Sequence, residues 1–150
     1  MNRIEFLRSF LGSGLLLTLP ASIFAETPED AFVYVPIYDD FVAGFQYYNG
    51  MSLLATMATE QPLDLVREPE NEYDNQAIAI YWEGQKLGFM PSRNNLIPST
   101  LLDAKIPCVA KIKAIHKESS PWTSLEFSIF LAYPKDFMPK NAGSFSDKFC

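Results

Sequence analysis

The stretch LVREPENEYDNQAIAI, at residues 65–80, places a polar loop between two apolar segments. Residues 63–67 alternate apolar and polar side chains, which predicts a strand, and the polar connection 68–75 follows. Residues 77–82 predict a second strand with Ile78, Ile80 and Trp82 on one face. Glu83-Gly84 then predicts a two-residue hairpin turn into a third strand at 85–90. This part of the chain therefore predicts antiparallel β-structure.

The chain upstream of this hairpin carries weaker signals, and the chain just after it predicts one helix. A first strand is expected at about residues 40–46, whereas residues 51–59 fit either a short helical turn or a loop. Residues 91–95 end the hairpin and offer Ser92 or Asn95 as a helix cap. A short helix is expected from there to about residue 104, with Pro98 tolerated in its first turn.

Two further alternating segments complete the predicted sheet. At residues 108–116, alanine and isoleucine alternate with Lys111 and Lys113, and residues 125–133 carry an apolar side chain at every second position. The length of 150 residues and the 48% hydrophobic content fit a single packed domain. About six short strands and one helix predict a mostly-β fold, a small closed or nearly closed barrel.

The amino-terminal segment has the pattern of a secretory leader. A short basic start, an apolar stretch and Ala25 occur in order, so we expect residues 1–25 to be a signal peptide cleaved after Ala25. The alternative is a retained amino-terminal anchor. The mature protein would be periplasmic or extracellular, with no stable membrane insertion. Residues 26–36 are expected to form an extended linker, and residues 134–150 a loosely held tail.

The charge of the chain limits its partners. The formal net charge is −6, and Arg3, Arg8 and Glu5 give residues 1–25 a net charge of +1, which leaves −7 on the remainder. An acidic domain has no overall field that attracts a polyphosphate. Strong non-specific nucleic-acid binding is therefore disfavoured, whereas a small local site is not.

Several motifs in a fixed order resemble those of the HIRAN domain family. The signature is the stretch at 65–80, and residues 41–50 carry a glycine, a tyrosine pair and a second glycine. The segments KLGFMP at 86–91, LLD at 101–103 and PW at 121–122 follow. The resemblance covers about residues 38–133, and we take 37–133 as the domain.

The resemblance implies an OB-like or SH3-like barrel that captures single-stranded DNA, notably its 3′ end. In such a pocket an aromatic ring stacks on a base and a carboxylate accepts the hydrogen bond of the terminal hydroxyl. At the position before the tyrosine pair, where DNA-binding relatives have a basic residue, this chain has Gln46, which loses the charge-assisted part of a phosphate contact. The nucleic-acid-binding residues that the resemblance implies are Tyr47, Tyr48, Asn71, Tyr73, Asp74 and Gln46, with Trp122 as a weaker candidate.

Five of these residues also have a purely structural interpretation. One of the two tyrosines would be a core residue if the pair alternates in a strand. Asn71 and Asp74 could only cap a turn through bonds to the backbone. Trp122 could pack over the end of the barrel, and the lysines at 111, 113 and 117 could be a solvated strand face or a strip that follows phosphates.

The sequence offers little for catalysis, a metal or a cofactor. His116 is the single histidine, and Cys108 and Cys150 are the two thiols. This set is too small and too dispersed for a zinc site, so no metal and no cofactor are expected. Cys108 is expected to be a buried free thiol, although pairing with Cys150 stays open. We therefore expect a binding protein and not an enzyme; hydrolase activity in relatives would come from fused helicase domains.

Two functions remain after this reasoning. The first is a nucleic-acid-binding module for the end of a single strand. The second is an exported interaction protein that uses the same barrel for a non-nucleic-acid polymer or a protein partner. The tyrosine pair and the Asn-x-Tyr-Asp pattern favour the first, whereas the leader and the acidity favour the second.

Overall fold

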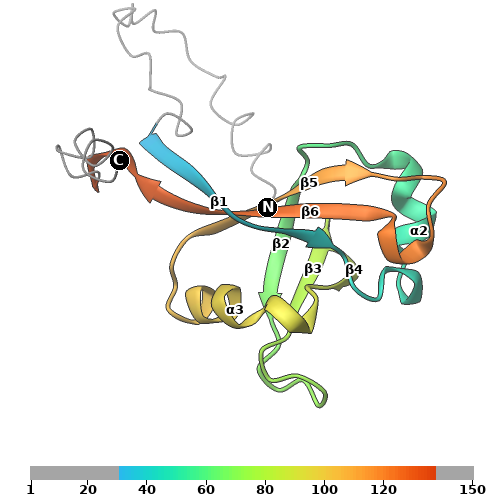
Figure 1. Ribbon diagram of the computed structural model, residues 1–150, viewed down its shortest axis with the longest axis horizontal. Coiled ribbons are helices and arrows are strands. Elements are labelled where there is room, and N and C mark those ends of the chain that lie inside the picture. Colours follow the sequence, from blue (N-terminus) through green and yellow to red (C-terminus); the bar gives the residue numbers. More distant parts are fainter. Residues whose placement is uncertain (1–30, 138–150) are drawn as a thin grey trace, which may run out of the picture.

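The computed structural model describes residues 31–137, which form one curled antiparallel sheet (Figure 1). Its six strands are arranged in the order β1-β6-β5-β2-β3-β4. The sheet does not close into a continuous ladder. The prediction of a mostly-β, small OB-like barrel with about six strands is confirmed. The strands are β1 (Phe32–Phe41), β2 (Pro62–Arg67), β3 (Ile78–Trp82), β4 (Gln85–Phe89), β5 (Cys108–Ile115) and β6 (Leu125–Pro134).

Short helices fill the connections between the strands. The α-helices are α2 (Gly50–Leu53) and α3 (Leu96–Asp103), and the 3₁₀ helices are η2 (Phe45–Tyr47), η3 (Leu54–Thr56), η4 (Ser92–Asn94), η5 (Pro121–Thr123) and η6 (Lys135–Phe137). The predicted helix after the hairpin is thus α3, and the undecided segment at 51–59 contains the end of α2 and all of η3. No helix among residues 31–137 is both long and apolar enough to cross a membrane.

Two backbone hydrogen bonds join the two edges of the sheet. The Ala43 amide donates to the Phe89 carbonyl at 2.8 Å, and the Phe89 amide donates to the Ala43 carbonyl at 2.9 Å. Because Ala43 follows β1 and Phe89 ends β4, this bridge links the first and last strands of the sheet order. It also brings the chain after β1 to the end of β4, where the candidate site lies.

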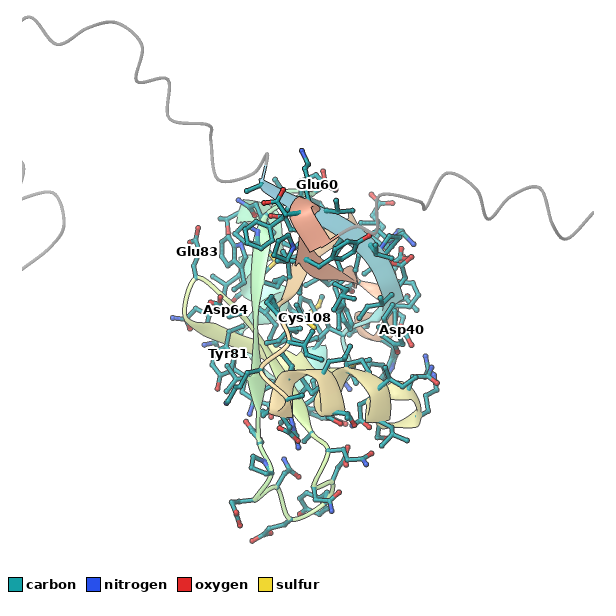
Figure 2. All side chains as sticks on the ribbon, turned by 90° about the vertical axis from the view of Figure 1, so that its left-hand side faces the viewer. Asp40, Glu60, Asp64, Tyr81, Glu83 and Cys108 are labelled. Carbon is teal, nitrogen blue, oxygen red and sulfur yellow. The ribbon has the colours of Figure 1, made fainter. Side chains whose placement is uncertain are left out.

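The core fills the inside of the curled sheet. The stripe on β3 is buried as predicted, because Ile78, Ile80 and Trp82 are at most 6% exposed. Phe127 and Ile129 of β6 pack in the same cluster. Figure 2 shows the side chains from the left of Figure 1, with Glu60 and Glu83 at the periphery. Burial of the apolar side chains is what holds the curled sheet together.

The first strand begins earlier than predicted. β1 starts at Phe32, so the expected linker at 26–36 does not extend to residue 36, and the strand expected at about 40–46 ends at Phe41. Proline lacks a backbone N–H group and is therefore rare inside a sheet. Pro36 is tolerated because β1 is an edge strand and its register with β6 shifts between Pro36 and Tyr38.

The hairpin between β3 and β4 forms as predicted. Glu83 and Gly84 have φ angles of +46° and +78°, so both central residues of the turn are left-handed, as a type I′ turn requires. The predicted leader lies outside the described residues. Most of the predicted tail lies outside them as well, because the last described residues are those of η6, just after β6.

Candidate functional site

The signature loop, residues 68–77, connects β2 to β3 and extends from one end of the barrel (Figure 1). Asn71 organises its turn: Oδ1 accepts the backbone N–H groups of Tyr73 at 3.0 Å and Asp74 at 3.3 Å. The Asn71 Nδ2 donates to Glu68 Oε2 at 3.1 Å. The turn-capping interpretation of Asn71 therefore matches its geometry, and this cap positions the two residues that follow.

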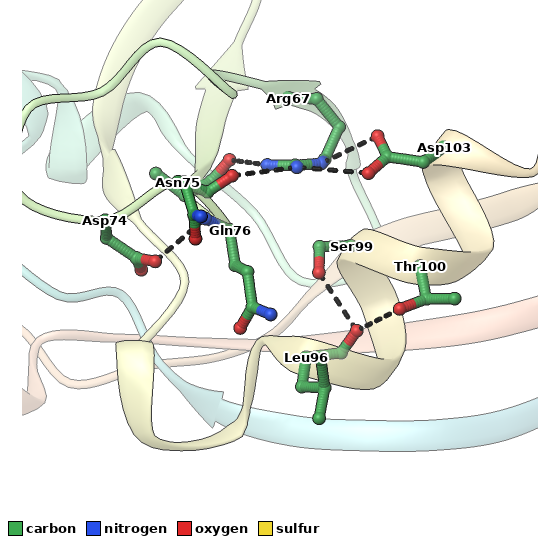
Figure 3. A network of polar contacts seen from close by, with 9 residues as sticks. Arg67, Asp74, Asn75, Gln76, Leu96, Ser99, Thr100 and Asp103 are labelled. Carbon is green, nitrogen blue, oxygen red and sulfur yellow. Dashed lines mark hydrogen bonds and ion pairs between the residues drawn. The ribbon is translucent and has the colours of Figure 1, made fainter.

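Arg67 holds the end of the signature loop against α3 (Figure 3). Its Nη1 donates to the Ala77 carbonyl at 2.6 Å, and its Nη2 donates to the Asn75 carbonyl at 3.0 Å. The Nε and Nη2 groups also donate to the two carboxylate oxygens of Asp103, at 2.9 and 3.1 Å. The hydrogen bond from Arg67 and its charge hold the pKa of Asp103 below its ordinary value. The planar guanidinium thus fastens a loop to a helix with four hydrogen bonds.

The Asp74 carboxylate is fixed by two donors. Its Oδ1 accepts the Gln76 N–H at 2.8 Å, and its Oδ2 accepts Asn95 Nδ2 at 2.6 Å. Asn95 occupies the N-cap position of α3, as predicted, but it is buried and its side chain makes no capping hydrogen bond to the helix. Each carboxylate oxygen can accept two hydrogen bonds, so Asp74 keeps acceptor capacity toward a ligand.

A pocket of about 320 Å³ opens between the signature loop, the end of β4 and the chain after β1. The ring of Tyr73 stands beside it and is 95% exposed, so one aromatic face is free to stack. Five of the eight lining residues were not predicted as site residues, although the KLGFMP motif contains two of them, Phe89 and Met90. The pocket is lined by Ala43, Asn71, Tyr73, Asp74, Ala77, Phe89, Met90 and Ser92.

The tyrosine pair does not lie in a strand. Gly44 has a φ angle of +74° and turns the chain into η2, with a hydrogen bond from the Tyr47 amide to the Gly44 carbonyl at 2.9 Å. Neither tyrosine is therefore a core residue, because Phe45 takes the buried position. The Tyr48 ring packs on Phe89 with the centroids 6.1 Å apart. Tyr48 thus supports a wall of the pocket, which no pattern in the sequence predicted.

Tyr47 and Trp122 form an exposed aromatic pair next to this wall. Their ring centroids are 6.5 Å apart at an interplanar angle of 82°. Tyr47 is 74% exposed and Trp122 is 60% exposed, so the interpretation of Trp122 as a packed cover of the barrel end is wrong. The two rings meet because η2 and η5 lie next to each other, although 75 residues separate them in sequence.

Gln46 is turned into the protein. Both polar atoms of its side chain are buried and make no hydrogen bond within residues 31–137. A 3₁₀ helix has three residues per turn, so the three residues of η2 point in three directions: Phe45 enters the core and Tyr47 faces solvent. In this geometry the Gln46 side-chain amide does not face a ligand, whereas the resemblance implies that it does.

Lys86 of β4 is the cation at the wall of the pocket. Its Nζ donates to Glu68 Oε1 at 2.7 Å, and both side chains are partly buried. The hydrogen bond from Lys86 holds the pKa of Glu68 below its ordinary value. Burial alone would lower the pKa of Lys86, but the hydrogen bond and the charge of Glu68 outweigh burial and raise it. Both groups are therefore charged at neutral pH.

The lysines of β5 belong to ion pairs. Lys111 pairs with Glu60 at 3.6 Å, and Lys113 pairs with Asp39 at 3.1 Å and with Glu126 at 2.7 Å. These ion pairs favour the interpretation of a solvated strand face over a strip that follows phosphates.

Cys108 is partly buried against the core, and burial raises the pKa of its thiol (Figure 2). Among residues 31–137 no three histidine, cysteine or acidic side chains gather as metal ligands would.

The fold and the signature loop have counterparts in known proteins. The HIRAN domain family model matches residues 38–133. A protein from Lactobacillus plantarum has a TM-score of 0.59 at 22% identity, covering 67% of this chain and 97% of its own. The HIRAN domain of human HLTF has a TM-score of 0.56 at 16% identity, covering 72% of this chain and 84% of its own. A search of curated proteins finds no match. The two structures support the fold, the family model covers well over half of the sequence, and the chain belongs to the HIRAN domain family.

Proposed function

We propose that this protein is a nucleic-acid-binding module that takes the 3′ end of a single strand into the pocket beside the signature loop. The observation that carries the proposal is the meeting of Tyr73, Asp74 and Phe89 at one pocket of about 320 Å³. A flat ring and a fixed carboxylate beside a partly apolar hollow fit a base together with a terminal hydroxyl. Membership of the HIRAN family supports the same assignment.

The two central residues have different tasks. The exposed Tyr73 ring stacks on a base, which contributes about 1–3 kcal/mol for any of the four bases. Asp74, held by Gln76 and Asn95, accepts the hydrogen bond of a free 3′ hydroxyl. A 3′ phosphate would instead be repelled by the negative charge of the same carboxylate. Binding, rather than catalysis, is therefore the activity that this pocket supports.

The test compares a short strand with a free 3′ hydroxyl and the same strand with a 3′ phosphate, by fluorescence anisotropy at low salt. A hydrogen bond to a charged group contributes roughly 1.5–3 kcal/mol, so we expect the hydroxyl strand to bind about tenfold or more tightly. Asp74→Ala should erase this preference, whereas Tyr73→Ala should weaken both strands alike. Equal binding of the two strands by the wild type would refute the role of Asp74.

A second candidate is an exported interaction protein for a non-nucleic-acid polymer or a protein partner. The exposed pair of Tyr47 and Trp122 favours it, because large aromatic side chains are common anchors in protein interfaces. The buried amide of Gln46 favours it as well, since that position supplies no charge to a phosphate. This candidate gains support if no strand binds at low salt.

A further inference from the structure

We propose that Lys86 supplies the positive charge of the pocket in place of the neutral Gln46, and that its ammonium binds a backbone phosphate of the bound strand. This inference rests on the proposed function. It concerns a residue on a different element from the tyrosine pair, brought to the pocket by the shape of β4.

A β-bulge aims Lys86 at the pocket wall. Along the β3–β4 pairing, Ile80 faces Gly88 whereas Tyr81 faces Lys86, so Leu87 is an extra residue on β4. In a regular strand, side chains three residues apart, such as those of Lys86 and Phe89, point to opposite faces. The extra residue in the bulge returns these two side chains to the same face.

The ammonium consequently lies over the aromatic wall. The Lys86 Nζ is 4.1 Å from the ring centroid of Phe89 and 5.4 Å from that of Tyr48. Phe89 lines the pocket. Lys86 is therefore at the edge of the site and held there by two cation–π interactions.

Glu68 positions Lys86 but does not occupy all three N–H donors of its ammonium. The side chains of Lys86 and Glu68 are 24% and 29% exposed, so the pair is shielded from water more than a surface pair is. An ammonium has three N–H donors, and one is directed at Glu68 at 2.7 Å. The exposed part of the group can therefore donate to a phosphate oxygen while Glu68 still positions it.

The other basic side chains near the site are engaged elsewhere. Arg67 is directed at Asp103 and at the carbonyls of the loop end. Arg93 follows the pocket residue Ser92, but its guanidinium pairs with Asp40. Among the basic side chains of residues 31–137, Lys86 is thus the one whose ammonium lies over the ring of the pocket residue Phe89.

The test measures the salt dependence of strand binding for Lys86→Met and for the matched control Lys113→Met. Both variants remove one ion-paired lysine from the same domain, but Lys113 lies on β5 with Asp39 and Glu126. For a single strand, the slope of log K against log salt changes by about 0.7 for each phosphate that the protein no longer neutralises. We expect this change, and roughly tenfold weaker binding at low salt, in Lys86→Met alone.

Two further arms locate the phosphate. Lys86→Arg keeps the charge and should restore the slope, and Glu68→Gln, which removes the competing charge, should strengthen binding. Replacing single linkages of the strand with neutral methylphosphonates should reveal one linkage whose replacement weakens the wild type but not Lys86→Met. Equal slopes for Lys86→Met and Lys113→Met would overturn the inference while leaving the proposed function intact. Failure of the wild type to bind any strand would overturn both.

Discussion

Gly88 lies in β4 where the chain after β1 crosses it, and a Cβ added there would stand 2.3 Å from the Ala43 carbonyl oxygen. Its φ angle of +148° is in a region that side chains with a Cβ rarely adopt. The two hydrogen bonds between Ala43 and Phe89 need this close approach. The motif KLGFMP therefore needs a glycine at this position, because a side chain there would prevent the two edges of the sheet from meeting.

We expect Gly88→Ala to lower the free energy of unfolding by about 3 kcal/mol, from a clash with backbone and from an unfavourable φ angle. Gly84→Ala is the matched control, because Gly84 also has a positive φ angle of +78° but has no atom within 4 Å of the added Cβ. The control should cost only about 1 kcal/mol. Urea denaturation measures both, and equal costs would contradict the close-approach argument.

At the level of elements, the signature loop is fastened where it enters β3. Arg67 ends β2, and its guanidinium binds the carbonyls of Asn75 and Ala77 as well as Asp103 of α3. One side chain thereby sets the position of a loop, a strand end and a helix (Figure 3). Because Tyr73 and Asp74 lie between Arg67 and the anchored Asn75 in sequence, the shape of the pocket depends on Arg67.

We expect Arg67→Lys to lower the free energy of unfolding by about 2 kcal/mol, because an ammonium cannot reproduce the planar fork. Hydrogen–deuterium exchange should be faster at the backbone amides of Tyr73 and Asp74, whose turn Arg67 anchors. Asp103→Asn is the control: it weakens the bond to the helix but keeps the bonds from Arg67 to the loop carbonyls. Equal acceleration of exchange in both variants would show that the bond to the helix, and not the bonds to the loop, orders the turn.

Over the whole molecule, the net negative charge repels a nucleic-acid strand. Any binding therefore depends on the few residues of the pocket. Removal of residues 1–25 would leave a net charge of −7, so long-range attraction to a strand is absent. In the function that we propose, affinity would then come from stacking on Tyr73, the Asp74 acceptor and the ammonium of Lys86. Such a site would discriminate strand ends better than it would coat internal stretches.

We propose that the protein is exported and that its mature chain begins at Glu26, because a basic start, an apolar stretch and Ala25 occur in order. Intact-mass measurement on protein purified from its own host should give the mass of residues 26–150 in the periplasmic or extracellular fraction. Recovery of the full-length chain from the cytoplasm would contradict this proposal.

The sequence by itself determined the features that depend on neighbours along the chain. Period-two alternation predicted β3, β5 and β6, and Glu83-Gly84 predicted the turn between β3 and β4, because side-chain direction and turn dihedrals are local properties. The ordered motifs were enough to identify the family. They also pointed to Asn71, Tyr73 and Asp74, which lie together at one pocket because they share one short loop.

Only the tertiary structure decided which distant residues complete that loop into a site. Pairing within the sheet allowed Pro36 into an edge strand and set the register that aims Lys86 at Phe89. The Asn95 side chain, at the N-cap position of α3, donates to Asp74, 21 residues away in sequence, and makes no hydrogen bond to the first turn of the helix. A periodic pattern carries no information on strand register or on which buried donor meets which acceptor, because both depend on how the whole sheet curls around its core.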